Sequence, residues 1–457
     1  MSSSPRTLFG TDGIRGKAGL KPLDPESVMR LGMAAADVLL PGFRREATHE
    51  WPTVVIGKDT RLSGDMLEAA IAAGLNARGI DVRLAGVVPT PAVAWLTRET
   101  GAAFGVVISA SHNPFDDNGI KFFDSRGIKL DDKTEAAIEA AFKGEIDPKA
   151  AEIGRTAPIK DAADRYVNFV CGLFQDHRDL FTGSRFALDA ANGAASVTST
   201  AILTHLGAKV SVFHDRPNGM NINRECGCTH PEAIESLVRE TGADAGISHD
   251  GDADRVMLCD ETGSSLDGDE LLAIAGLDLL NRGELNQATV VGTLMSNAGL
   301  EACLAERGGR LVRAGVGDRY VMREMLANDY NFGGEQSGHL IFRDLNPTGD
   351  GIVAAVRLLE ISRRTGKPLS EMRRVLKKFP QTQRNLRVKA KPPLETVPTV
   401  SAVIEAANRT LGNQGRVLVR YSGTESLLRV LVEGRDDLPI DALADEIASA
   451  VGAEIGA

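Results

Sequence analysis

One pattern recurs along the chain and limits what it can fold into: a short apolar run rich in Val and Ile, followed by a polar turn. Such runs are typical of strands buried in a parallel sheet. Apolar residues at helical spacing lie between them, so the sequence predicts alternating strands and helices in an α/β protein. The apolar runs are TVVIG at 53–57, FGVVIS at 104–109, ADAGIS at 243–248, TVVGTL at 289–294 and RVLVR at 416–420.

Several domains are expected, because 457 residues exceed the roughly 250–300 that one hydrophobic core serves. Polar, Pro-containing stretches at 144–159 and 378–393 are the candidate junctions, and the pattern restarts between 257 and 269. Apolar spacing after polar starts predicts helices over residues 65–78, 132–142, 231–240, 269–281 and 352–364.

Composition narrows the range of partners. A net charge of −10 and only 5% aromatic residues disfavour nucleic acid, whereas a small anion can still bind where a few cations converge. Five cysteines, an odd number, argue against a disulfide framework, and Cys226-Gly-Cys228 alone is a weak zinc motif. The start of the chain is not signal-like and no apolar run reaches about 18 residues, so we expect a cytoplasmic protein without membrane contact.

The polar turns that follow the apolar runs carry the chemistry. In open α/β sheets ligands bind beyond the carboxyl ends of the strands, so we expect these turns to converge on one cleft. The turn after ADAGIS holds Asp250, Asp252 and Asp254, and three carboxylates at alternate positions suit a hard cation such as Mg²⁺. An EF-hand would place Asp250 and Glu261 at positions 1 and 12, but position 6 is Arg255 and not Gly.

The turn after FGVVIS reads Ala110-Ser111-His112-Asn113-Pro114. Ser111 at a strand end is a candidate nucleophile or phosphoryl carrier, although Ser and Asn before Pro also cap ordinary turns. A Ser–His–Asp hydrolase is disfavoured because no G-x-S-x-G elbow surrounds Ser111, and because His112, its immediate neighbour, is poorly placed to act as its base.

Cationic residues recur at Gly-flanked turns, where they can hold phosphate. Ser422-Gly423-Thr424 adds two hydroxyls and backbone N–H groups, a suitable phosphate cradle. In the GGEQSGH segment Glu335 and Ser337 are candidates for binding sugar hydroxyls. The same segment's His339 is a candidate acid or base. The cations are Arg15, Lys58, Arg61, Lys121, Arg255, Arg420 and Arg429.

Together the motifs FGTDGIRG, ISASHNPFDDNGIKFF, DGDADR, GGEQSGH and RYSGTES strongly resemble the α-D-phosphohexomutase family, in its order and spacing from Phe9 to Arg429. ISASHNP with GGEQSGH is most similar to the bacterial phosphoglucosamine mutases. Tyr421 and Ser426 stand where that subgroup usually has prolines. The resemblance implies three related mixed-sheet α/β domains and a smaller C-terminal α+β domain around a central cleft, divided here as 1–156, 157–258, 259–374 and 375–457.

The resemblance also implies roles. Ser111 would be the phosphoserine and would share one Mg²⁺ with Asp250, Asp252 and Asp254. Arg15, Lys121 and His339 would serve catalysis at Ser111. Glu335, Ser337 and Arg255 would bind the sugar phosphate. The phosphate that does not react would be held by Arg420, Ser422, Gly423, Thr424 and Arg429.

The reaction expected from the resemblance interconverts glucosamine 6-phosphate and glucosamine 1-phosphate through a 1,6-bisphosphate, a step toward amino-sugar nucleotides. A phosphosugar is the expected partner, and the resemblance allows a homodimer. Three alternatives stay open: the same chemistry on mannose or glucose phosphate, a catalytically silent sugar-phosphate-binding regulator, and a phosphatase.

Overall fold

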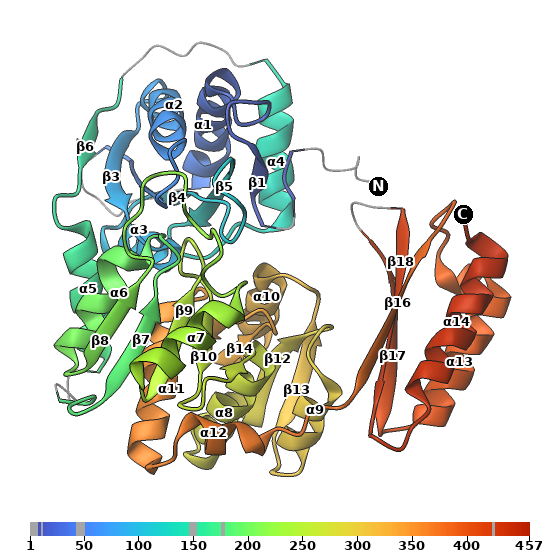
Figure 1. Ribbon diagram of the computed structural model, residues 1–457. Helices are drawn as coiled ribbons and strands as arrows, with labels where there is room; N and C mark the ends of the chain where they lie inside the picture. The colour runs from blue at the N-terminus through green and yellow to red at the C-terminus, as the bar shows by residue number, and fades with distance from the viewer. Residues whose placement is uncertain (1–7, 11, 43–50, 146–152, 175–178, 423–425) are drawn as a thin grey trace.

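The computed structural model describes residues 8–10, 12–42, 51–145, 153–174, 179–422 and 426–457. Their strands form four sheets, and we call the units built on these sheets domains I to IV in chain order. Domains I, II and III lie against one another, while domain IV stands to one side of domain III (Figure 1).

Domain I is built on a six-stranded mixed sheet of order β1-β5-β4-β2-β3-β6. Helices α1, α2 and α4 cover one face, and α3 covers the other, next to α5. Helix α1 begins where the Asp24 carboxylate caps the backbone N–H of Ser27 and Pro25 takes the first helical position. The elements are β1 Ile14–Lys17, α1 Pro25–Leu39, β2 Thr53–Lys58, α2 Gly64–Asn76, β3 Asp81–Val87, α3 Thr90–Glu99, β4 Phe104–Ile108, β5 Asp117–Asp124, α4 Asp132–Lys143, β6 Thr156–Pro158 and α5 Ala162–Leu173.

Domain II has a five-stranded mixed sheet of order β11-β10-β9-β7-β8. Strand β9 runs parallel to β7 and antiparallel to β10, so the Asp250 loop is a tight connection between two buried strands. An EF-hand is therefore excluded, because that motif needs a helix on each side of its loop. The elements are β7 Arg185–Asp189, α6 Ala195–His205, β8 Lys209–Phe213, α7 Pro231–Thr241, β9 Ala245–His249, β10 Val256–Cys259 and β11 Ser265–Leu266.

Domain III has a four-stranded sheet of order β13-β12-β14-β15, with β15 antiparallel to β14. Helix α8 begins with a reciprocal capping box between Asp267 and Glu270. The elements are α8 Gly268–Asn281, β12 Thr289–Thr293, α9 Ala298–Ala305, β13 Arg310–Ala314, α10 Asp318–Asn328, β14 Phe332–Gly334, β15 Leu340–Phe342, α11 Gly351–Thr365 and α12 Leu369–Met372.

Domain IV is an antiparallel three-stranded sheet of order β16-β18-β17 with two helices on one face. The sequence predicted RVLVR as a buried parallel strand, and this was wrong: β17 is antiparallel and only half-buried, because just one face of this small sheet is covered. The elements are β16 Gln381–Arg387, α13 Pro398–Leu411, β17 Gly415–Tyr421, β18 Leu427–Gly434 and α14 Ile440–Ile455.

The hydrophobic cores separate domain IV from the other three domains. One cluster of buried side chains runs without interruption through domains I, II and III. Domain IV has a core of its own, built mainly from β18, α13 and α14, with half-buried side chains of β16 and β17 packed against it. The first three domains are therefore packed as one body, and the fourth is folded around a separate centre.

The predicted fold class is confirmed, with three mixed-sheet α/β units followed by a smaller C-terminal unit. The five predicted helices correspond to α2, α4, α7, α8 and α11. The domain boundaries at 156, 258 and 374 stay predictions; strand pairing puts β6 in the first sheet and β11 in the second. Within the described ranges, no helix combines the length and apolar character needed to span a bilayer.

A buried hydrogen bond joins α5 to domain III and yields a first prediction. The Tyr166 hydroxyl lies 2.8 Å from both carboxylate oxygens of Asp350, which caps α11 through the N–H groups of Ile352 and Val353. Tyr166→Phe removes this bond to a charged acceptor and is expected to lower the free energy of unfolding by about 1.5–3 kcal/mol. Urea denaturation followed by circular dichroism measures it.

Tyr421→Phe is the matched control, because the Tyr421 hydroxyl donates to the neutral Pro392 carbonyl at 2.7 Å in half-buried surroundings. A loss for Tyr166→Phe no larger than the control's would contradict the prediction.

Candidate active site

Ser111 lies in the turn that follows β4, in a left-handed backbone conformation that residues other than glycine seldom adopt. Its φ is +52°, and its side chain is buried. The carbonyl of Ser111 accepts hydrogen bonds from Arg61 Nη2 at 2.9 Å and Asn223 Nδ2 at 2.8 Å. Strain of this kind persists only when surrounding contacts hold it in place, and here they come from two domains.

Arg61 braces the whole turn. Its guanidinium also donates to the carbonyls of Asn113 at 2.8 Å and Asp117 at 3.0 Å, and pairs with the buried Asp59 carboxylate at 2.9 Å. Asp59 in turn accepts from Ser109 Oγ at 2.6 Å, which accepts the Ser111 N–H at 2.9 Å. Arg61, expected as a candidate phosphate ligand, is therefore committed to the architecture of the Ser111 turn.

The acidic triplet of domain II lies directly against Ser111. Ser111 Oγ donates a short hydrogen bond to Asp250 Oδ2. One oxygen from each of Asp250, Asp252 and Asp254 lies within 4.8 Å of the other two. Gly251 lets the loops approach this closely, since a Cβ there would stand 2.7 Å from the Ser111 carbonyl oxygen.

The triplet fits a divalent cation. Burial, followed by the charges of Asp254 and Asp252, raises the pKa of Asp250 well above its usual range. Asp252 Oδ1 is buried and accepts no hydrogen bond within the described structure, and Asp254 Oδ1 has only long ion pairs there, with His339 at 3.6 Å and Arg255 at 3.9 Å. A buried carboxylate oxygen without a donor at hydrogen-bond distance is costly, and a hard cation bound among these oxygens would supply the missing partner.

His112 lies closer to Ser111 than the sequence suggested, with its Nδ1 3.3 Å from Ser111 Oγ. Burial, and then the positive charges of Arg255 and Arg15, lower the pKa of His112 to about 4. The imidazole of His112 is therefore neutral near pH 7. Ser111 Oγ lies beside this imidazole and also donates its hydrogen bond to the Asp250 carboxylate.

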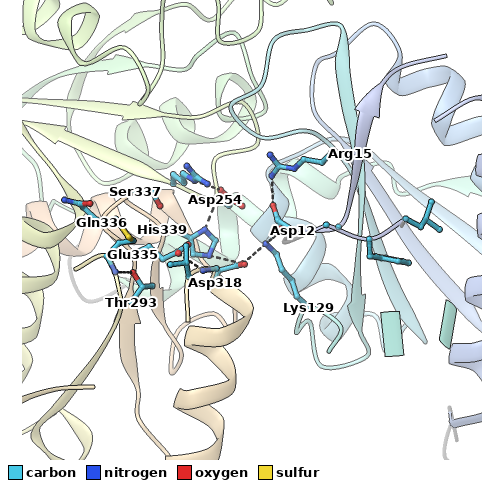
Figure 2. Close-up of a pocket in the computed structure, with 18 residues that line it drawn as sticks. Asp12, Arg15, Lys129, Asp254, Thr293, Asp318, Glu335, Gln336, Ser337 and His339 are labelled. Atoms are coloured by element: carbon cyan, nitrogen blue, oxygen red, sulfur yellow. Dashed lines mark hydrogen bonds and ion pairs between the residues drawn. The ribbon is translucent and has the colours of Figure 1, made fainter. Parts of the chain in front are cut away.

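Six side chains of alternating charge form a closed ring between domains I, II and III. Around the ring the contacts are Lys121–Asp12 at 3.0 Å, Asp12–Lys129 at 2.7 Å, Lys129–Asp318 at 2.5 Å, Asp318–His339 at 3.3 Å, His339–Asp254 at 3.6 Å and Asp254–Lys121 at 3.5 Å. We call these residues the charge ring. Figure 2 shows Asp12 and Lys129 of domain I facing Asp318 and His339 of domain III.

The ring determines the charges of its members. Burial opposes ionisation, but Lys121 and then His339 hold the pKa of Asp254 well below its usual range. For His339 burial lowers the pKa, and Asp254 and Asp318 outweigh it and raise the pKa above its usual value. Lys129 has its pKa raised in the same way by Asp12 and Asp318.

A cavity of about 680 Å³ opens beside the ring, with walls from domains I, II and III. Of the residues predicted for the site, Arg15, Glu335, Ser337 and His339 line it, as does Asp254 of the triplet (Figure 2). Arg255 lines it as well. Lys121, expected in a turn, lies within strand β5 and contacts Asp252 at 3.0 Å.

The phosphate-binding group predicted in domain IV is not at this cavity. Arg420 and Arg429 are direct neighbours on β17 and β18, and Ser422 follows β17, but no described residue of domain IV lines the cavity. Gly423 and Thr424 lie outside the described residues. The expected convergence of all five turns is therefore wrong for this one, since domain IV stands apart. Lys58 does not line the cavity either, and its ammonium forms ion pairs with Asp65 at 2.7 Å and Glu68 at 2.5 Å.

Sequence reasoning missed Asp12, Lys129 and Asp318. Asp12 was within the FGTDGIRG motif and Lys129 just beyond the Ser111 motif, so the neighbourhood was a signal for both. Cys226 lies with Asp189 and His214 in a second group of potential ligands. Asp189 already accepts from His214 Nδ1 at 2.9 Å and from the N–H of Gly227 at 2.8 Å, so the group acts as a loop brace.

The chain matches four domain models that together describe one protein family. They are the phosphoglucomutase/phosphomannomutase alpha/beta/alpha domains I, II and III at residues 6–149, 164–263 and 267–379, and the C-terminal domain at 384–450. The chain belongs to the phosphoglucomutase/phosphomannomutase family. The resemblance carried by the sequence motifs is confirmed, and membership makes the chain an enzyme of the mutase class.

Known relatives extend over the whole chain. Phosphoglucosamine mutases from Syntrophotalea carbinolica and Pelobacter propionicus are 48% and 49% identical to it over 455 residues, covering 99% of this chain and 98% and 99% of theirs. A family protein from Burkholderia thailandensis has the same fold, with a TM-score of 0.81 at 25% identity, covering 98% of this chain and 97% of its own.

The position of His339 gives a second prediction. A Cβ on Gly349 would lie 1.9 Å from His339 Nε2, so Gly349→Ala must push the imidazole out of the charge ring. We expect kcat to fall by about 10²-fold, the scale of a 1 Å misplacement in an active site. Steady-state kinetics with the isomerisation assay described below measures this, with circular dichroism to verify folding.

Gly172→Ala is the matched control, because a Cβ there meets nothing within 4 Å and the residue is helical. Equal kcat values for Gly349→Ala and Gly172→Ala would show that the imidazole's position is unimportant.

Proposed function

We propose that the chain interconverts glucosamine 6-phosphate and glucosamine 1-phosphate, with Ser111 as the phosphoryl carrier. The observation that supports this best is the placement of Ser111 Oγ, which is buried and bonded to Asp250 among three carboxylates. The choice of sugar rests on the full-length relatives named phosphoglucosamine mutase at 48–49% identity.

The proposed reaction has two phosphoryl transfers. In the first, the 1-hydroxyl of glucosamine 6-phosphate attacks the phosphorus on Ser111: the O1–P bond forms, the Oγ–P bond breaks, and the hydroxyl proton passes to a nearby base. In the second, after the 1,6-bisphosphate has turned over in the cleft, Ser111 Oγ attacks the 6-phosphoryl group, and the O6–P bond breaks as O6 takes up a proton. Glucosamine 1-phosphate leaves and Ser111 is phosphorylated again.

The described residues suit these steps by charge and position. Lys121 and Arg15 supply positive charge beside Ser111, where charge develops on the transferring oxygens. His339, held at the cavity wall with its pKa raised, would give O6 its proton in the second transfer. Glu335 and Ser337 line the same wall and would hold the sugar, with Glu335 Oε1 anchored by the Gly317 N–H at 2.9 Å.

The cation proposed for the acidic triplet is Mg²⁺, held by Asp250, Asp252 and Asp254 with an oxygen of the phosphorylated Ser111. Bound there, it would neutralise negative charge on the transferring phosphoryl group. The donor set is all oxygen, which matches the preference of Mg²⁺. An N-acetylphosphoglucosamine mutase of Aspergillus fumigatus, solved with GlcNAc-6P and magnesium, has the same fold, with a TM-score of 0.64 at 17% identity, covering 97% of this chain and 95% of its own.

Domain IV would bring its phosphate-binding group to the cavity by moving as a unit. Its core is separate from that of the other domains, so such motion does not disturb their packing. Arg420 and Arg429 side by side offer a cationic pair for the phosphate that does not react. The group's release and return would allow the bisphosphate to turn over without leaving.

The test of the proposed function is the conversion of glucosamine 6-phosphate, with Mg²⁺ and a trace of the 1,6-bisphosphate. Ser111→Ala is expected to abolish it, because Ala has no oxygen to carry the phosphoryl group. Relative kcat/KM for the glucosamine, glucose and mannose phosphates decides the sugar. A clear preference for glucose or mannose would overturn the choice, and unchanged activity in Ser111→Ala would overturn the role of Ser111.

A separate prediction concerns the cation. Asp252→Asn removes one negative charge from the triplet and is expected to weaken Mn²⁺ binding, used as a spectroscopic substitute for Mg²⁺, by at least about tenfold. Electron paramagnetic resonance of free Mn²⁺ measures this without turnover. Asp437→Asn, an exposed carboxylate in domain IV, is the control; equal affinities in the two variants would locate the cation elsewhere.

A further inference from the structure

We propose that Lys129 and Asp318 are positioning residues, whose ion pair carries His339 and the sugar-binding loop of domain III into register with the Ser111 turn of domain I. The inference rests on the proposed function of the cavity as the site of a phosphosugar mutase. It assigns a role to two residues that lie in none of the motifs from which the site was predicted.

Lys129 is the link on the domain I side. It lies just after β5, with its side chain only 11% exposed, and its ammonium contacts Asp12 Oδ1 at 2.7 Å and Asp318 Oδ2 at 2.5 Å. Asp12 also contacts Lys121 at 3.0 Å and Arg15 at 2.7 Å, the two cations proposed to act beside Ser111. One buried ammonium thus joins the cationic cluster of domain I to a carboxylate of domain III.

Asp318 is the link on the domain III side. It opens helix α10, where a carboxylate is favoured by the helix dipole, and its Oδ2 lies 3.3 Å from His339 Nε2. The preceding residue, Gly317, donates its N–H to Glu335 Oε1 at 2.9 Å. Two consecutive residues therefore hold both ends of the 335–339 loop, the sugar-binding carboxylate and the imidazole.

The arrangement explains why the pair affects the reacting geometry and not only the cohesion of the domains. Without the Lys129 ammonium, the carboxylates of Asp12 and Asp318 face each other with no cation between them. Without the Asp318 carboxylate, Lys129 loses its partner in domain III and the imidazole keeps only Asp254. In both cases the cavity residues remain, but the charged contact between domains I and III beside the cavity is lost, and His339 is linked to the Ser111 turn only through Asp254.

A second ion pair across the same interface provides a matched control. Arg319, next to Asp318, pairs with the buried Glu135 of α4 at 2.6 Å and with Asp132 at 3.2 Å. This pair joins domains I and III as Lys129–Asp318 does, but it contacts neither His339 nor Lys121 within the described contacts. Glu135→Gln therefore weakens the interface while leaving the charge ring intact.

The experiment is a double-mutant cycle on the full chain with Lys129→Met, Asp318→Asn and the double variant. We expect each single change to lower kcat by about 10–100-fold, with KM within about threefold of wild type, because cavity contacts persist while geometry loosens. The kcat of the double variant should be no more than about threefold below that of the less active single variant, since the two residues act as one unit. Glu135→Gln should retain kcat within about twofold.

A measurement without turnover accompanies the kinetics. Hydrogen–deuterium exchange over residues 333–342 should become faster in Lys129→Met and Asp318→Asn, and stay at the wild-type rate in Glu135→Gln. If Lys129→Met does not fold, the nearly isosteric Asp318→Asn carries the test by both readouts.

The results that overturn the proposal are specific. Three results would each show that the ion pair only holds the domains together. They are losses of kcat that multiply in the double variant, a change confined to KM, and an effect of Glu135→Gln as large as that of the single variants. Failure of the proposed function is distinguishable: the cycle is run on whichever hexose phosphate the wild type isomerises, and with no turnover at all the exchange measurement alone decides. Exchange over 333–342 unchanged in both single variants would then overturn the proposal.

Discussion

The three packed domains depend on one another because six buried or nearly buried charges between them must be paired. Asp254 comes from domain II, Asp318 and His339 from domain III, and the remaining three members from domain I. Removing one partner of a buried pair typically costs about 3–5 kcal/mol, because it leaves a charge without compensation. The ring therefore tolerates only a narrow range of domain orientations, and the cavity beside it has a defined shape.

The same dependence reaches Ser111. Its left-handed conformation is held by Arg61 from its own domain and by Asn223 from domain II, and its hydroxyl bonds to Asp250 of domain II. Positive charge from Lys121 approaches from β5. The proposed nucleophile, the acidic triplet and a cationic cluster are thus fixed by the packed body, whereas the predicted phosphate-binding arginines belong to a domain with a separate core. In the proposed function the reacting groups therefore belong to the packed body, and the exchange of ligand contacts belongs to the domain with its own core.

Much of this was predictable because it is local. Val- and Ile-rich runs followed by polar turns identified β2, β4, β9 and β12, and helical spacing identified the five expected helices. The triplet of alternate aspartates is a pattern within one turn, so its fit to a cation could be read directly. The expectation that Lys58 could hold phosphate was wrong, because a Gly-flanked cation looks the same in sequence whether or not it lies near the site. The expectation that β17 is a parallel strand was also wrong, because an apolar run looks the same in a parallel and an antiparallel sheet.

By itself, the sequence determined the alternation of strands and helices, the number of structural units, the Ser111 turn, the acidic triplet and the family. These follow from periodicity, turn chemistry and short motifs, which act over a few residues. Only the tertiary structure decided that Asp12, Lys129 and Asp318 join Lys121 and His339 in one ring, and that domain IV stands away from the cavity. The partners in a charge pair are chosen by distance in space, and Asp12 and Lys129, 117 residues apart in the chain, meet only after the domain has folded.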